Sequence, residues 1–594
     1  MLPRPLSRAR LGLFGILVGI GVGQAVAAIT IGLLVERGFE LLVTNTGTVT
    51  ASVAVPIAAG LGVGVLLTAV LRGVERPVAE LLGQRYVVEV RETLFTHLTR
   101  VPARELGRRS RGSMLMRFVG DIAALRSWVS LGLARLLVGG LAVGLSTLLL
   151  MVINVALGAT VGGVLLAGGL ATWAASPRLM RKTRHARRHQ SRLTGEVTER
   201  LTQIAVLQAS GQERREGKRV KRKSSRVADA MVSRAGATGV SRAVAEGTAA
   251  LCAVSVLLVG AIEVRAGRAS PGAVVAAVSI AGLLAGHLRD LGRVAEYAAG
   301  ARVAREAATR FLDMSPLADP PGAPALDVRG GEVQLRDVVL GEALCGVNLH
   351  AAAGQTIAVV GPNGAGKSTL VALASRMVDP DEGQVRIDDQ DLRTRSLSSV
   401  RKAVGLAGPD LPLLRGSMDR NVRYRLPRCD EDEVARVAAL CELQAVADDL
   451  PDGWRSDVGE GGSRLSAGQR ARLTIARAAL GRPAVLVLDE AEAHLDRDAA
   501  GVVDRVLADH HGTALVVTHR RELAQRADQI WCLINGRVAE VGPPGQLLNG
   551  TGPTARLFAR HPEHQPGELP AERPRGDDLE GHEHGARVVQ VEGR

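Results

Sequence analysis

Long uncharged apolar stretches are the feature that most constrains this chain. Six of them approach or reach the roughly 20 apolar residues that an α-helix needs to cross a bilayer. They lie at residues 11–35, 52–72, 130–152, 154–175, 244–264 and 269–288. One such stretch could be a buried Gly- and Ala-rich helix of a soluble protein. Six of them, alternating with charged segments, predict an all-α transmembrane domain instead.

The segments between these stretches predict the orientation. Short polar loops join stretches one and two and stretches five and six, whereas long basic segments with helical periodicity separate two from three and four from five. Because cytoplasmic loops carry an excess of Lys and Arg, the long segments and the N-terminus are predicted to lie in the cytoplasm. The first stretch is too long for a secretory signal, so we expect a retained helix of a multi-pass plasma or inner membrane protein.

The positive net charge comes mainly from the segments between the apolar stretches. The net charge of +14 comes largely from basic residues crowded between apolar stretches, as in residues 181–188, and aromatic residues make up only 2%. This pattern favours cytoplasmic loops over a nucleic-acid groove, so no nucleic-acid partner is expected. The five cysteines lie far apart without CxxC spacing, which indicates reduced thiols and no zinc site.

The composition changes after the sixth stretch and predicts a multidomain chain. Residues 1–315 form the transmembrane domain with its long cytoplasmic helical loops, and the proline-rich residues 316–328 form a linker. Short apolar runs alternate with helical stretches over 329–560, which is the pattern of an α/β domain. Residues 561–594 are polar and predict a disordered tail.

A phosphate-binding loop lies in the α/β domain. The stretch "TIAVVGPNGAGKSTL" (356–370) places an apolar strand before a complete G-x-x-x-x-G-K-[ST] motif. In this motif backbone N–H groups and a helix N-terminus bind phosphates, the lysine contacts the β- and γ-phosphates, and the first hydroxyl ligates Mg²⁺. The predicted nucleotide-binding residues are Gly361, Pro362, Asn363, Gly364, Ala365, Gly366, Lys367, Ser368 and Thr369.

A second apolar strand ends in two adjacent acids. The stretch "VLVLDEAEAH" (485–494) stops on Asp489 and Glu490, and paired carboxylates after a buried strand need a positive or reactive partner. The phosphate-binding loop supplies that partner. Asp489 is therefore predicted to bind Mg²⁺ together with Ser368, and Glu490 to act as the general base for an attacking water.

Between these two motifs the chain resembles an ATP-binding cassette (ABC) transporter, in the exporter class that fuses membrane and nucleotide-binding domains. The family's signature loop is similar to Leu465, Ser466, Ala467, Gly468 and Gln469, with alanine in place of a glycine. Residues 458–462 resemble the exporter loop that communicates with the membrane domain. "AHLD" with Asp496 resembles the D-loop, and "VVTHR" supplies His519 as the switch histidine. The resemblance implies a six-helix transmembrane domain followed by an ABC ATPase domain of the α/β P-loop NTPase class.

The resemblance also implies a mechanism. Two cassettes face head to tail, and each contributes Ser466 and Gly468 to ATP held by the other's loop 361–369. This half-transporter would work as a homodimer or heterodimer that uses ATP and Mg²⁺ to export an unidentified substrate by alternating access. Coupling to the membrane domain is expected near residues 117–127 and 203–213.

Two departures from the family pattern leave an alternative open. Pro409 falls where the family has a glutamine, and the neighbouring Asp410 is a candidate replacement ligand for Mg²⁺. Residues 333–349 contain no aromatic side chain to stack on adenine. The chain could therefore be an ATP-binding but weakly hydrolytic partner subunit of a heterodimeric exporter. An importer energy module is disfavoured because importers mostly keep the two parts on separate chains.

The transported substrate cannot be predicted from these stretches. Ionisable residues at or within them are candidates for a polar translocation path, and those at stretch ends could instead lie at the membrane interface. They are Arg135, Glu246, His287, Arg289 and Asp290.

Overall fold

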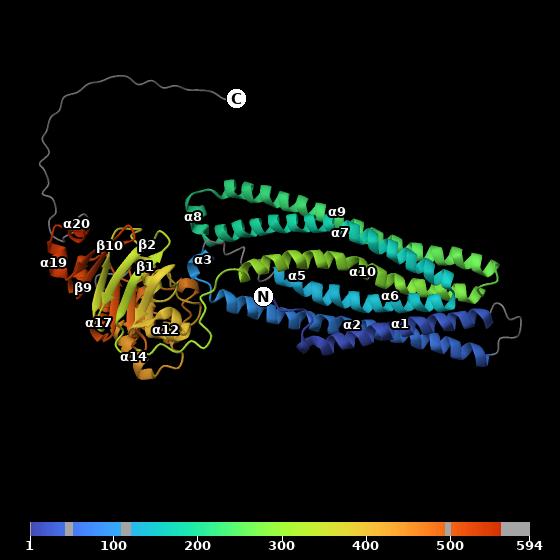
Figure 1. Ribbon diagram of the computed structural model, residues 1–594, viewed down its shortest axis with the longest axis horizontal. Coiled ribbons are helices and arrows are strands. Elements are labelled where there is room, and N and C mark those ends of the chain that lie inside the picture. Colours follow the sequence, from blue (N-terminus) through green and yellow to red (C-terminus); the bar gives the residue numbers. More distant parts are fainter. Residues whose placement is uncertain (1, 42–50, 108–119, 493–500, 560–594) are drawn as a thin grey trace, which may run out of the picture. The chain divides into compact units, whose positions relative to one another are not determined.

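The computed structural model describes residues 2–41, 51–107, 120–492 and 501–559 (Figure 1). The chain divides into two compact units, Met1–Ala318 and Asp319–Arg594, and the division falls inside the segment 316–328 that was expected to be a linker. Asp496 of the predicted D-loop and the predicted tail 561–594 lie outside the described residues.

The first unit consists of long helices, and six of those described are long and apolar enough to cross a membrane. Their parts are α1 (Leu11–Phe39), α2 (Ala51–Leu98), the continuous run of α5 (Ile122–Ser127), η4 (Trp128–Leu133) and α6 (Ala134–Ile153), then α7 (Val155–Thr202), α9 (Glu213–Arg265) and α10 (Pro271–Leu312). Short helices η1 (Arg8–Arg10), α3 (Ala103–Gly107) and α8 (Ile204–Ala209) complete the unit. The predicted all-α unit with six spans is confirmed.

Several helices extend far beyond the predicted spans. Helix α7 contains 48 residues, which corresponds to about 72 Å at 1.5 Å per residue. A bilayer core of about 30 Å accounts for less than half of that length. The basic segments are rich in Arg, Ala, Glu and Lys, which are good helix formers, so each continues the helix that leaves the apolar stretch.

Capping residues begin two of the described membrane helices after short turns. Asn154 accepts a hydrogen bond from the N–H of Leu157 at 3.1 Å at the start of α7. Ser270 accepts one from the N–H of Ala273 at 3.0 Å at the start of α10, where Pro271 occupies the first helical position. Both polar caps are strong helix-start signals, and in α10 the proline strengthens the signal.

Small residues allow close packing of the membrane helices. A side chain at Gly32 would come within 2.6 Å of Ile280, and one at Gly292 would meet Ala245 at 2.3 Å. Glycine at such contacts lets helix backbones approach one another. Around these contacts, buried apolar residues form two clusters, one of which includes Leu82.

The second unit contains two sheets. The antiparallel sheet has the order β2-β1-β4-β5, with β1 (Val333–Leu340), β2 (Leu344–Ala351), β4 (Glu382–Ile387) and β5 (Gln390–Asp391). The other sheet has the order β10-β9-β3-β8-β7-β6, with β10 (Arg537–Gly542), β9 (Gln529–Ile534), β3 (Thr356–Val360), β8 (Thr513–Val517), β7 (Val485–Asp489) and β6 (Val404–Ala407). Only β10 is antiparallel among the described strands of the second sheet.

Helices surround these sheets and confirm the predicted α/β class (Figure 1). They are α11 (Lys367–Ala374), α12 (Leu397–Ala403), α13 (Met418–Val422), α14 (Glu431–Leu440), α15 (Leu443–Asp448), α16 (Ala467–Ala479), α17 (Gly501–Asp509), α18 (Arg521–Arg526), α19 (Pro544–Asn549) and α20 (Pro553–Ala559). Single turns are η5 (Leu392–Thr394), η6 (Arg423–Arg425), η7 (Gly453–Arg455) and η8 (Glu460–Gly462).

The apolar runs of the parallel strands are buried on both faces. In β7, Val485 and Val487 belong to one core cluster, whereas Leu486 and Leu488 belong to the other. This alternation is the period of two expected of a strand. Since β3, β6, β7 and β8 run parallel, their carboxyl ends lie at one edge of the sheet.

Asp388 stabilises the start of the second unit. Its carboxylate accepts hydrogen bonds from the backbone N–H groups of residues 329–332 at 2.7–3.1 Å. Burial alone would raise the pKa of this carboxyl, but the four N–H groups keep its pKa below the ordinary value. The resulting stabilisation is therefore present at neutral pH and is lost as the pH falls through the lowered pKa.

We predict that Asp388→Asn lowers the free energy of unfolding by about 1–3 kcal/mol, because an amide nitrogen then faces partly buried N–H donors. Asp389→Asn is the matched control, since Asp389 has the same left-handed backbone but only exposed ion pairs at 3.6 and 3.8 Å. Calorimetry of the full-length protein in detergent should show a drop of several degrees for the first variant only. Equal shifts for both variants would contradict this assignment.

Candidate functional site

The loop between β3 and α11 encloses the Lys367 side chain. Lys367 is only 6% exposed, and its Nζ donates to the carbonyl oxygens of Gly361 at 2.8 Å and Pro362 at 3.2 Å. Burial lowers the pKa of this ammonium, while the nearby Glu490 and Asp489 carboxylates act to raise it. The loop therefore holds a largely desolvated cation that an anionic ligand would stabilise.

Two glycines of the loop are required by its backbone. Gly361 has φ +152° and Gly366 has φ +101°. A Cβ would come within 2.2 Å of the Leu533 carbonyl oxygen at the first position and within 2.5 Å of the Ala343 carbonyl oxygen at the second. No side chain caps the start of α11, so its first N–H groups are left for a phosphate, as the motif predicts.

The carboxyl end of β7 brings the predicted acids to this loop. Burial raises the pKa of Asp489, and the charges of Glu490 and then Asp410 raise it further. The Ser368 hydroxyl acts to lower the pKa of Asp489, which places the two side chains close together. A hydroxyl and an acid-crowded carboxylate are hard oxygen donors that fit Mg²⁺, because a divalent cation would relieve the repulsion.

Asp410 is the acid that the sequence proposed as a replacement for the missing glutamine. It follows β6, which pairs with β7, and its charge acts directly on Asp489. The structure therefore places Asp410 near the predicted Mg²⁺ ligands, although it is separated from Asp489 by almost eighty residues of sequence.

Glu490 and His519 meet at the same edge. The His519 Nε2 lies 3.1 Å from Glu490 Oε1. Glu490 adopts φ +49°, and its N–H donates to the Val517 carbonyl at 3.1 Å. Both side chains are partly exposed, at 39% and 45%. A solvated carboxylate oriented by a histidine can accept a proton from water.

Sequence reasoning missed Glu492. This carboxylate is 5% exposed and accepts a hydrogen bond from the Thr518 hydroxyl at 2.5 Å. Burial raises its pKa, and the Thr518 hydroxyl in turn accepts from the N–H of Arg520. The Glu492–Thr518 hydrogen bond thus joins the segment after β7 to the segment after β8. The Glu490–His519 pair joins the same two segments. The signal was the additional acid in "DEAEAH".

The predicted signature loop forms the start of α16. Ser466 and Gln469 make a reciprocal capping box, with bonds of 3.1 Å to the Gln469 N–H and 2.9 Å from the Ser466 N–H. Leu465 is buried, whereas Ser466 and Ala467 are exposed. Among the described residues no hydrogen bond joins 465–469 to 361–369. The capped helix start therefore faces solvent.

A polar cavity of about 190 Å³ lies in the membrane unit. Arg135 and Asp290 form an ion pair of 3.1 Å beside it. The ionisable residues that line it are Arg72, Glu75, Arg76, Arg135, His287 and Asp290. Three of these were predicted, but Arg289 pairs instead with Glu246 at 3.8 Å. Arg72, Glu75 and Arg76 were missed because they lie at or beyond the end of the predicted second span.

Comparison with known proteins identifies the family. The sequence model of the ABC transporter matches residues 344–493, and that of the ABC transporter transmembrane region matches residues 14–288. The chain is 31% identical over 395 residues to the "ATP-dependent lipid A-core flippase" of Ralstonia nicotianae, covering 64% of this chain and 67% of that protein. The chain belongs to the ABC transporter family. It joins the membrane and ATP-binding regions of that family in one multi-pass membrane protein.

Other relatives agree with this family. This ABC transporter is 29% identical over 555 residues to the "Multidrug efflux ATP-binding/permease protein" of Mycobacterium bovis. That match covers 90% of this chain but 45% of the relative, so the chain spans about half the length of that protein. The solved "Structure of a bacterial Atm1-family ABC exporter with ATP bound" has a TM-score of 0.85 at 24% identity, over 93% of this chain and 99% of that one. It shows the shared fold.

We predict that Asp410→Ala raises the Mg²⁺ concentration needed for half-maximal ATPase activity by about tenfold or more, the scale at which supporting carboxylates affect metal affinity. Titration of Mg²⁺ at fixed ATP measures this shift. Asp432→Ala is the control, because Asp432 is an exposed acid on α14. An unchanged Mg²⁺ dependence in Asp410→Ala would remove Asp410 from the site.

The turn between β1 and β2 offers no aromatic side chain to stack on the nucleotide base, which predicts that the protein distinguishes ATP only weakly from GTP. The Ala343 carbonyl lies against Gly366 of the phosphate-binding loop, and the exposed residue beside it is Glu342. An aromatic ring on a nucleotide base contributes about 1–3 kcal/mol, so Glu342→Tyr should tighten ATP binding at least fivefold. ATP and GTP should bind the unmodified chain within a few-fold of each other in calorimetric titrations. Glu342→Gln controls for the lost charge, and equal affinity in both variants would contradict the prediction.

Proposed function

We propose that this protein is an ATP-driven exporter that works as a dimer of half-transporters and moves an unidentified substrate by alternating access. The observation that carries the proposal is the pairing of Glu490 with His519 at 3.1 Å, beside a buried Lys367 and an acid-crowded Asp489. A general base and its orienting group are the parts that a non-hydrolytic subunit can lose. Their presence together favours an active ATPase.

In this reaction Glu490 takes a proton from the attacking water as the water oxygen bonds to the γ-phosphorus. The bond from the γ-phosphorus to the bridging oxygen breaks, and ADP leaves. Lys367 and the N–H groups at the start of α11 stabilise the phosphate charges in a partly buried site. Mg²⁺ would be held by Ser368 and Asp489, with Asp410 as a further ligand, and would neutralise part of the phosphate charge when bound.

The exposed start of α16 supports the dimer. Ser466 and Gly468 lie at a helix N-terminus, where N–H groups attract phosphate. In the proposed assembly each copy presents this end to ATP held by the partner's loop 361–369. ATP then joins the two cassettes, and its hydrolysis releases them, which supplies the two states that alternating access requires.

Helix α8 is the candidate that couples the two domains. It interrupts the long α7–α9 hairpin, contains no buried residue, and exposes Ile204 and Val206 at 42% and 63%. Exposed apolar side chains on a short helix suit docking against another domain. In the other predicted coupling segment, residues 117–119 lie outside the described part of the chain, and Ile122–Ser127 continue into the membrane helix.

The membrane unit supplies the transport path in this proposal. Charged side chains inside a membrane helix bundle cost free energy, and such residues often mark a substrate path. Those around the 190 Å³ cavity include the Arg135–Asp290 pair. The N-terminus and the nucleotide-binding unit are proposed to be cytoplasmic, in a plasma or inner membrane, because the basic helix extensions adjoin that side. The alternative of a weakly hydrolytic partner subunit rests only on Pro409 and the missing aromatic residue.

ATPase activity of the purified full chain in nanodiscs tests the proposal. We expect the chain alone to hydrolyse ATP, and Glu490→Gln to reduce kcat by at least 100-fold while ATP binding is retained, since an amide cannot accept the proton. Glu522→Gln, an exposed acid on α18, is the control. Equal low rates for the unmodified chain and Glu490→Gln would instead support the weakly hydrolytic partner.

A further inference from the structure

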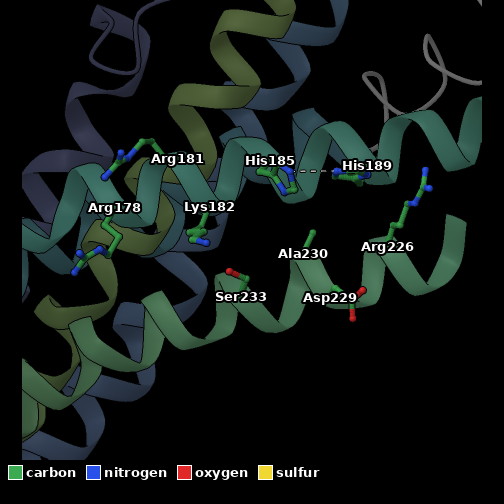
Figure 2. Close-up of a pocket in the computed structure, with 9 residues that line it drawn as sticks. All are labelled: Arg178, Arg181, Lys182, His185, His189, Arg226, Asp229, Ala230 and Ser233. Carbon is green, nitrogen blue, oxygen red and sulfur yellow. Dashed lines mark hydrogen bonds between the residues drawn. The ribbon is translucent and has the colours of Figure 1, made fainter. Parts of the chain in front are cut away.

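A basic crevice lies between α7 and α9 in the membrane unit (Figure 2). It has a volume of about 620 Å³ and is lined by Arg178, Arg181, Lys182, His185, His189, Arg226, Asp229, Ala230 and Ser233. The α7 residues recur at helical spacing and therefore share one face. Figure 2 shows Lys182 and Ser233 pointing into the space between the two helices.

The charges of this crevice are not balanced locally. Four Arg or Lys residues and two histidines line the crevice, together with a single carboxylate residue, Asp229. The His185 and His189 Nε2 atoms lie 3.2 Å apart. Among the described residues, Arg178, Arg181, Lys182 and Arg226 form no ion pair within 4.0 Å.

Some neighbouring cations on the same helices are paired. Arg184 binds Glu306 at 2.6 Å, and Arg187 binds Asp121. On α9, Arg234 binds Glu296 at 3.3 Å. In the part of the chain that the structure describes, the four Arg and Lys side chains that line the crevice have no such carboxylate partner. Closely spaced unpaired cations repel one another, and an anion between them would remove that repulsion.

The length of the crevice indicates whether its anionic ligand is a lipid headgroup or a water-soluble molecule. No charged residue lies between Val155 and Pro177, so Arg178 marks the end of the apolar part of α7. His189 is eleven residues further along, or about 16 Å. The headgroup layer on one side of a bilayer is about 5–7 Å thick. A lipid phosphate would reach the Arg178 end only, whereas a water-soluble anion can reach the whole crevice.

We propose that this crevice binds a water-soluble organic anion that carries two or more carboxylate or phosphate groups. Its volume is in the range of small-molecule sites. The crevice is lined by arginines from both helices, which include Arg181 of α7 and Arg226 of α9, and a guanidinium can bind an anionic group through two N–H donors. This site takes no part in the proposed ATPase cycle. Only its location in the cytoplasm rests on the membrane orientation in the proposed function.

Calorimetric titration of tricarballylate, a tricarboxylate, into the full-length protein tests this site. The protein is held in phosphatidylcholine nanodiscs at about 0.1 M salt, without nucleotide. We expect saturable binding that the double variant Arg181→Gln/Arg226→Gln weakens at least tenfold. The matched control is Arg214→Gln/Lys221→Gln, which removes two exposed charges of α9 outside the crevice and should change affinity less than twofold.

Three results would overturn the proposal: no saturable binding, equal weakening in both double variants, or a tenfold loss of tricarballylate affinity when phosphatidylglycerol is added to the nanodisc. The last result would assign the crevice to lipid headgroups. Glu490→Gln should bind tricarballylate normally, and the Arg181→Gln/Arg226→Gln variant should keep basal ATPase activity. Failure of the anion site is thereby distinguishable from failure of the proposed ATPase.

Discussion

A buried ammonium group opposite two adjacent carboxylates is the interaction on which the nucleotide-binding unit depends. Lys367 is held by the carbonyl oxygens of Gly361 and Pro362, while Asp489 and Glu490 approach from the end of another strand. Charges of this kind are costly in an apolar interior unless they compensate one another. The parallel sheet supplies that compensation, because β3 and β7 both pair with β8 and end at one edge.

The register of these strands leaves little freedom. Alternate residues of β7 enter two different core clusters, so a shift of one residue would exchange the two sets of side chains and move Asp489 away from Ser368. The same pairing determines where the residues after β6 and β8 emerge, which places Asp410 and His519 at the site. Packing of the core and placement of the chemistry are therefore consequences of one register.

In the membrane unit, single long helices extend through two environments. Their apolar parts suit a bilayer, and their charged parts form ion pairs with neighbouring helices, as Arg184 does with Glu306 and Arg234 with Glu296. The sequence predicted the apolar part of each helix but not where the helix ends. The basic residues that follow an apolar stretch continue the same helix, so no sequence signal marks the end of the span. Between α7 and α9, Arg200 binds Glu216 and Lys223 binds Glu196, whereas the four Arg and Lys side chains that line the crevice form no ion pair among the described residues.

The sequence by itself determined the features that are contiguous along the chain: six apolar stretches, the phosphate-binding loop, the acid pair after a buried strand, and the capped signature segment. Local periodicity and short motifs carry such features, because a span or a loop is made by neighbouring residues. Only the tertiary structure decided that His519 meets Glu490, that Glu492 binds Thr518, and that Arg135 pairs with Asp290. These contacts join distant segments, and strand order and helix packing decide which of them meet.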